Sequence, residues 1–246
     1  AKYDKLADKY GYVMVYPKGM ADYGTRSSNN WSSWNVGSNG LSSTCINADS
    51  YCYDSCEAAN KCGACAWTTC YDDVLFIDTI LREVERKHCV ETSKRFLTGI
   101  SNGGMMVYHY ASKRPKTFKG YMPIFGSPML GTLGVPREVS SAWLLHFHGL
   151  EDTTVPIGGG ASYDGWLYIS ADETIKIWAE MQECTMNTNP ISTPWDSGKL
   201  GLSCIYYIGC KGKIFKCTYP GGHYDWPSGS EELGYWFFNR SSETEF

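Results

Sequence analysis

The sequence predicts an α/β protein with a mainly parallel sheet flanked by helices, and two observations support this class. Apolar segments of strand length alternate along the chain with segments of helical periodicity, as parallel strands joined by crossover helices require. No repeat or low-complexity linker divides the 246 residues, of which 43% are hydrophobic. This composition is enough for a sizeable core, so we expect a single domain over residues 1–246.

The strand candidates are short runs, most of them apolar and bounded by glycine or proline, which interrupt regular structure. They cover residues 11–17, 95–100, 120–126 and 142–149, and residues 204–220 supply two more strands around a Lys-Gly turn. Helical segments lie between several of these strands, which is why we expect the sheet to be mainly parallel.

The helix candidates have apolar residues at intervals of three and four. Residues 71–88 place apolar side chains on one face, and residues 102–114 continue a helical pattern that stops before Pro115. Ser170 and Glu173 form a capping box, in which each side chain can accept from the backbone N–H of the other. The helix that it opens carries Ile175, Trp178 and Met181, and the face of the first helix consists of Val74, Ile77, Leu81 and Val84.

Charge and hydropathy argue against two kinds of partner. The formal net charge is −4 and the sequence has no basic run, whereas nucleic-acid-binding domains concentrate Lys and Arg on one face. No apolar stretch approaches the roughly 18 residues that cross a bilayer. We therefore expect no nucleic-acid partner and no membrane span.

Cysteine usage points to a secreted protein. Six of the eleven cysteines crowd into a polar, turn-rich segment that buries little by itself, so cross-links would supply its order. The alternative is a zinc site at Cys62 and Cys65, but the segment lacks histidine and a second clean Cys-x-x-Cys pair, so we expect disulfides and no metal. An odd total leaves one thiol free or paired outside the chain. Sequons at Asn30 and Asn239 are compatible with a secreted glycoprotein. The disulfide candidates are Cys45, Cys52, Cys56, Cys62, Cys65, Cys70, Cys89, Cys184, Cys204, Cys210 and Cys217.

Ser101 is the candidate nucleophile. It lies in Gly-Ile-Ser-Asn-Gly at residues 99–103, which matches G-x-S-x-G, although three fixed residues often coincide by chance. Its context is more specific, because a strand candidate ends at Ile100 and a helix candidate begins at Asn102. A tight turn between strand and helix exposes the serine hydroxyl, and the helix N-terminus favours negative charge that develops beside it.

A serine hydroxyl needs a base, and the base needs an acid that orients it. When the chain order is nucleophile, acid and histidine, His223 is the only histidine that follows every plausible acid. Glu151 and Asp152 both follow a strand candidate, and position favours neither strongly. We interpret His146 and His148, at or near the end of that strand, as structural.

The chain contains a set of further stretches in a recognisable order: LADKYGYVMVYPKG, WNVG, DDVLFI, TGISNGGMM, HGLEDTTVP, IKIWAEMQEC and GGHYDWP. In this combination, which spans nearly the whole chain, it resembles the secreted polyhydroxybutyrate depolymerase-like esterases. These include feruloyl and acetylxylan esterases of the α/β-hydrolase fold. The resemblance implies that Ser101 is the nucleophile, Asp152 the acid and His223 the base, and it separates Asp152 from Glu151.

The same resemblance implies roles for several neighbouring residues. The backbone N–H of Asn102 would be one oxyanion donor, and Cys184 would pair with Cys210. Trp226 is similar to a tryptophan beside the catalytic histidine of the family, and we expect Trp34 and Trp226 to contact the substrate.

Three features depart from the family pattern. Residues 38–70 form a cysteine-rich insertion, and the stretch His-Tyr-Asp-Trp has one residue more than the common spacing between His223 and Trp226. In the family, the strand that carries the second oxyanion donor should precede residue 1 in the chain. Within the sheet, that strand lies between the strands at 11–17 and 95–100. We therefore expect the sequence to be incomplete at its N-terminus, or another segment or a partner chain to complete the sheet.

These observations predict a secreted serine carboxylesterase that needs no cofactor. Its substrate would be a feruloyl or acetyl ester of a polysaccharide, such as one of the plant cell wall, or a polyester of the polyhydroxyalkanoate type. The alternative is a catalytically silent protein of the same fold that serves as a structural or binding component of an extracellular assembly. A serine peptidase on this fold is a third, weaker hypothesis.

Overall fold

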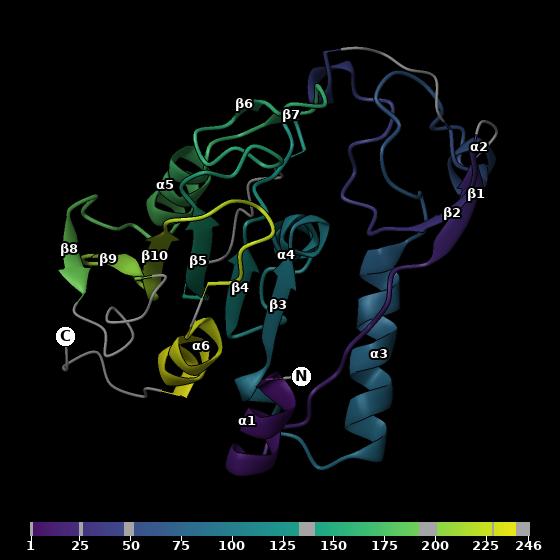
Figure 1. Cartoon of the computed structure of the whole chain (residues 1–246). Coiled ribbons are helices and arrows are strands. Elements are labelled where there is room, and N and C mark those ends of the chain that lie inside the picture. Colours follow the sequence, from purple (N-terminus) through teal and green to yellow (C-terminus); the bar gives the residue numbers. More distant parts are fainter. Residues whose placement is uncertain are drawn as a thin grey trace.

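The central sheet is mixed and mostly parallel (Figure 1). A computed structural model describes residues 2–24, 27–46, 52–132, 141–191, 201–227 and 229–239. Within these ranges the strand order is β3-β4-β5-β10-β9-β8, with parallel pairing from β3 to β10 and antiparallel pairing of β9 and β8. The fold class predicted from the sequence is confirmed. The strands are β3 (Phe96–Ile100), β4 (Gly120–Ile124), β5 (Trp143–Gly149), β8 (Thr188–Ile191), β9 (Ser203–Tyr207) and β10 (Ile214–Tyr219).

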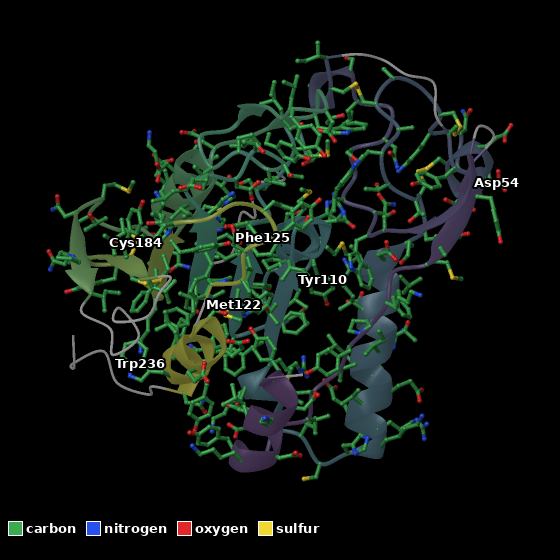
Figure 2. The ribbon with its side chains drawn as sticks, viewed as in Figure 1. Asp54, Tyr110, Met122, Phe125, Cys184 and Trp236 are labelled. Atoms are coloured by element: carbon green, nitrogen blue, oxygen red, sulfur yellow. A yellow bond between two sulfur atoms is a disulfide. The ribbon has the colours of Figure 1, made fainter. Side chains whose placement is uncertain are left out.

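Helices cover both faces of this sheet, because successive side chains of each strand point to opposite sides. On β5, Leu144 belongs to one apolar cluster, whereas Leu145 and Phe147 belong to another. The first cluster includes residues of α3 (Asp73–Lys87), α4 (Asn102–Lys113) and α5 (Ala171–Met181). The second includes residues of α6 (Ser230–Asn239), on which α1 (Lys2–Tyr10) packs through stacked rings of Tyr10 and Tyr235. Figure 2 shows side chains filling these layers, with Tyr110 and Met122 inside.

The helices predicted from periodicity are confirmed at α3, α4 and α5. Ile77 is buried in the first apolar cluster, with Val74 and Leu81 packed against it. Ser170 caps α5, because its Oγ accepts a hydrogen bond from the backbone N–H of Glu173 at 3.0 Å. The two strands expected within residues 204–220 are β9 and β10, which pair antiparallel.

One predicted strand is not formed. Residues 12–20 have no regular structure and run as an irregular trace between α1 and β1 in Figure 1. An apolar run becomes a strand only when a neighbour pairs with its N–H and C=O groups. Among the described residues, no segment pairs with the edge of β3 opposite β4, so the run at 11–17 lacks such a neighbour. Its side chains at Val13, Val15 and Tyr16 are exposed.

The cysteine-rich segment is held by three disulfides and little regular structure. It contains η1 (Ser42–Thr44) and α2 (Asp54–Ala58), and it lies beside the hairpin of β1 (Ala21–Gly24) and β2 (Ser27–Ser32). The buried carboxylate of Asp22 links the two, because its Oδ2 accepts from the Ser55 N–H at 2.8 Å. The bonds are Cys45–Cys65, Cys52–Cys62 and Cys56–Cys70, so Cys62 and Cys65 are not joint zinc ligands.

Of the five cysteines outside this segment, four form two more disulfides and one is free. Cys204–Cys217 joins two directly paired residues of β9 and β10, and Cys184–Cys210 is the pair that the family resemblance implied. Cys89 is free and exposed, which accounts for the odd total. Two short strands, β6 (Gly160–Ala161) and β7 (Leu167–Tyr168), and the turn η2 (Thr92–Lys94) complete the regular elements described. Over the ranges given above, no helix is long and apolar enough to cross a bilayer.

Candidate active site

Ser101 occupies a strained turn between β3 and α4. Its backbone has φ +51° and ψ −120°, a region that residues other than glycine rarely adopt and that costs of the order of 1–3 kcal/mol. Close backbone packing enforces this geometry. A Cβ atom on Gly99 would lie 2.3 Å from the carbonyl oxygen of Gly103, and one on Gly126 would lie 2.4 Å from that of Ser101. The glycines therefore allow the turn to close, and the turn presents the Ser101 hydroxyl at the start of α4.

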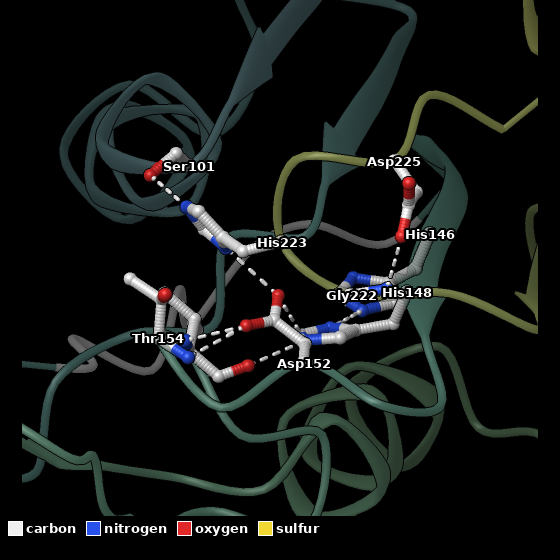
Figure 3. Close-up of polar contacts among 9 residues, drawn as sticks. Ser101, His146, His148, Asp152, Thr154, Gly222, His223 and Asp225 are labelled. Carbon is white, nitrogen blue, oxygen red and sulfur yellow. Dashed lines mark hydrogen bonds and ion pairs between the residues drawn. The ribbon is translucent and has the colours of Figure 1, made fainter.

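Three loops bring Ser101, His223 and Asp152 together (Figure 3). Each loop follows the carboxyl end of a parallel strand, β3, β10 and β5 respectively, so the three side chains meet at one edge of the sheet. His223 Nε2 lies 2.8 Å from Ser101 Oγ, and His223 Nδ1 lies 2.8 Å from Asp152 Oδ2. A carboxylate accepts, so Nδ1 carries the proton of the neutral ring and Nε2 is free to accept from the serine.

Asp152 is a buried carboxylate whose two oxygens have different hydrogen-bond partners. Its Oδ1 accepts from the backbone N–H groups of Thr154 at 2.9 Å and Val155 at 2.8 Å, while Oδ2 faces His223. Glu151 is exposed, and its backbone N–H donates to the carbonyl of Gly221. The geometry thus selects Asp152, and not Glu151, as the partner of His223.

The loop that carries His223 is held in place by its own contacts. The N–H of Gly222 donates to Asp225 Oδ2 at 2.7 Å, and the Phe125 ring packs edge-on against the imidazole with 5.0 Å between ring centroids. The ring of His223 is therefore fixed from the β4 side as well as by Asp152.

Comparison with known proteins shows which proteins this chain is similar to. The chain is 31% identical over 163 residues to a probable feruloyl esterase C of Aspergillus niger, an alignment that covers 64% of the chain and 52% of that protein. It is 29% identical over 163 residues to feruloyl esterase C of Emericella nidulans, with the same coverage. The chain is therefore similar to feruloyl esterases, and its fold is that of the α/β-hydrolases. It spans about half the length of the curated relatives that it matches.

A solved structure supports the same fold. The acetyl xylan esterase from Aspergillus awamori superposes with a TM-score of 0.54 at 17% identity, covering 96% of this chain and 81% of that one. No family model matches the sequence.

The residue after Ser101 makes a side-chain contact that sequence reasoning missed. The side-chain amide of Asn102 pairs with the backbone of Trp34: its Oδ1 accepts from the Trp34 N–H at 2.6 Å, and its Nδ2 donates to the Trp34 carbonyl at 3.1 Å. The Trp34 ring lies beside Gly103, in the first turn of α4, and stacks on Phe76 with centroids 6.3 Å apart. No local signal predicts this contact, because the two partners are 68 residues apart.

Trp226 is positioned differently from Trp34. Its indole N–H donates to Glu231 Oε1 at 2.9 Å, and its ring packs partly buried against the apolar cluster under α6. The structure thus places Trp34 beside the turn at Ser101 and links Trp226 to the start of α6. A substrate contact for either residue stays a prediction.

His146 and His148 are fully buried on β5, and hydrogen bonds satisfy their ring nitrogens. Burial lowers the pKa of both rings below the ordinary range of histidine. This burial fits the structural interpretation made from the sequence, although the sequence did not indicate that His148 lies beside Asp152.

Proposed function

We propose that this chain is a secreted serine carboxylesterase. The observation that carries the proposal is the continuous hydrogen-bonded series from Ser101 through His223 to the buried carboxylate of Asp152. Such a series is the arrangement that activates a serine hydroxyl at neutral pH. The five disulfides favour an oxidising compartment, and thus secretion.

The proposed reaction proceeds in two steps. His223 Nε2 takes the Ser101 proton as Oγ attacks the ester carbonyl, and Asp152 stabilises the imidazolium that forms. The backbone N–H of Asn102, at the start of α4, donates to the oxyanion of the tetrahedral intermediate. His223 then protonates the leaving alcohol, and a water molecule, deprotonated by the same nitrogen, releases the acid and restores Ser101.

Feruloyl esters are the substrate class that we favour. The relatives at about 30% identity are named feruloyl esterases, and the stacked rings of Trp34 and Phe76 lie beside the first turn of α4, where an aromatic acyl group could pack. Acetylated polysaccharides and polyesters are the other classes that the family resemblance implies. We further propose that residues 1–246 form one domain and that the insertion at 38–70 shapes its substrate entrance.

The test compares wild type, Ser101→Ala and Ser93→Ala on p-nitrophenyl acetate, methyl ferulate and a fluorogenic peptide panel. We expect wild type and Ser93→Ala, which changes an exposed serine outside the site, to hydrolyse the esters equally. Ser101→Ala should lose about 10⁴-fold or more of kcat. Equal, negligible turnover by all three proteins would refute the esterase proposal and favour a structural or binding component. Turnover of peptides alone would indicate a peptidase.

A further inference from the structure

Two histidines stand at consecutive inward positions of β5, in a layer that is otherwise mostly apolar. His146 and His148 share a face of the strand with Leu144, and both have no exposed surface. Tyr108 of α4 reaches them from the helix layer and is also buried. Unpaired polar groups are costly in such a place, so the partners of these three side chains carry information about what they do.

The partners form an unbroken series. The Tyr108 hydroxyl lies 2.9 Å from His146 Nδ1, His146 Nε2 lies 3.1 Å from His148 Nδ1, and His148 Nε2 lies 2.8 Å from the carbonyl oxygen of Val155. Figure 3 shows the two histidines beside Asp152. The series therefore runs from α4, through β5, into the loop that carries Asp152.

The last contact fixes every proton in the series. A carbonyl oxygen only accepts, so His148 Nε2 carries the proton. Burial keeps both rings neutral, so His148 Nδ1 must accept, His146 Nε2 must donate and His146 Nδ1 must accept from the Tyr108 hydroxyl. Burial also raises the pKa of Tyr108, so its hydroxyl keeps the proton that it donates. One arrangement of protons satisfies all three groups.

Val155 connects this series to the candidate acid. Its carbonyl accepts from His148, and its N–H donates to Asp152 Oδ1 at 2.8 Å. His148 Nε2 also lies 3.7 Å from Asp152 Oδ2, the oxygen that contacts His223. One buried imidazole thus restrains the loop behind one carboxylate oxygen and directs a positive N–H dipole at the other.

We propose that Tyr108, His146 and His148 are positioning residues that hold Asp152 in the orientation that His223 requires. This inference rests on the proposed esterase function. The series holds the Asp152 loop against β5, so that the carboxylate faces His223 Nδ1 and not solvent.

The neutrality of His148 is part of the same role. The charged or titratable groups that act on it are Asp152, His223 and Lys216, and His146 adjoins it on β5. Lys216 faces His146 across the β5–β10 pair and binds Asp172. A charged His148 would compete with the His223 imidazolium for the carboxylate. Because His148 stays neutral, Asp152 stabilises the charge of His223 alone.

A purely structural role for the series predicts a different result from a positioning role. If the histidines only fill the core, their loss lowers stability but leaves each correctly folded molecule fully active. If they position Asp152, each folded molecule turns over more slowly while substrate binding is unchanged, because Asp152 acts in the transition state.

The test uses His148→Leu, which removes the donor to Val155, and His148→Gln, whose amide N–H can replace it. Rates on p-nitrophenyl acetate are normalised by active-site titration with a serine-directed phosphonate. We expect His148→Leu to lose about 10- to 100-fold of kcat with KM unchanged, and His148→Gln to recover most of this loss. Tyr108→Phe should reduce kcat in the same direction by less.

Leu145→Ala is the matched control, because Leu145 is buried on the opposite face of the same strand. It should lower the melting temperature but leave kcat per titrated site at the wild-type value. The proposal is overturned if His148→Leu keeps the wild-type kcat per site, or if His148→Gln is no better than His148→Leu.

A measurement on wild type covers the cases in which the variants do not fold or the protein shows no esterase activity. Imidazole ¹⁵N NMR at pH 7 should show His146 and His148 as neutral rings protonated at Nε2, and His223 protonated at Nδ1. If the His146 or His148 ring were positively charged, or protonated at Nδ1 and not at Nε2, the proton arrangement would be refuted. A protein with the expected spectrum but without ester turnover would contradict the proposed function and leave the proton arrangement standing.

Discussion

At the scale of single residues, Ser101 has an unfavourable backbone that its neighbours impose. Its positive φ persists because β4 and α4 approach the turn so closely that residues 99 and 126 have no room for a side chain. The strain is useful if Ser101 is the nucleophile, because it keeps the hydroxyl in one place before substrate arrives.

Gly99→Ala tests this dependence. The added Cβ would lie 2.3 Å from the Gly103 carbonyl oxygen, so the turn must shift; we expect a loss of stability of about 1–3 kcal/mol and a marked fall in kcat. Gly158→Ala is the matched control, because nothing lies within 4 Å of its added Cβ and its φ is not positive. Urea denaturation and p-nitrophenyl acetate turnover measure both effects. Equal behaviour of the two variants would contradict the close-packing argument.

At the scale of elements, the cysteine-rich segment is organised by cross-links and one buried amide. Asn39 Oδ1 accepts from the N–H groups of Trp67 at 2.8 Å and Thr68 at 3.2 Å, so a single side chain holds the two ends of the segment together. Local sequence indicates that such a segment needs disulfides. It does not indicate which cysteines pair, because the pairing depends on the path of the segment in space, including the packing of its helix α2 on β1.

Counting free thiols tests whether all cysteines except Cys89 form disulfides. Alkylation of the denatured protein without reductant should add one label, at Cys89, and alkylation after reduction should add eleven. Intact mass gives the number, and peptide mapping gives the position. Three or more labels without reductant would contradict the five disulfides and weaken the proposal of secretion.

At the scale of the whole molecule, buried titratable groups should make stability depend on pH. Burial lowers the pKa of His109 to about 4 and depresses the pKa of His146 and His148, so the folded protein binds fewer protons than the unfolded chain below about pH 6.5. Burial raises the pKa of Asp73 to about 6, which acts in the opposite direction between about pH 6 and pH 4. The three histidines outweigh the one carboxyl group.

We therefore expect the free energy of unfolding to fall by a few kcal/mol, on the order of 3, between pH 7.5 and pH 5. Urea denaturation at pH 7.5, 6.0 and 5.0 measures this dependence. His109→Gln should reduce the slope, because it removes one of the titrating groups without adding a charge. Stability that is constant or rises toward pH 5 would contradict the burial of the histidines as neutral rings.

Much of the fold follows from local pattern. Apolar periodicity predicted α3, α4, α5 and five of the six central-sheet strands that the described residues form, because helices and strands place their apolar side chains at intervals set by backbone geometry. The error at residues 11–17 has the same origin: the apolar run has strand character, but a strand also needs a partner, and local pattern does not supply one.

The sequence by itself determined the class of the fold, the turn at Ser101 and the choice of His223 as the last histidine in the chain. It also determined that most cysteines form disulfides. The resemblance to known esterases selected Asp152, and the tertiary structure alone showed its contact with His223, the disulfide pairs of the insertion and the series from Tyr108 to Val155. The reason is physical. Propensity and periodicity depend on neighbours along the chain, whereas hydrogen-bond partners such as Ser101 and His223, 122 residues apart, are chosen by distance in space.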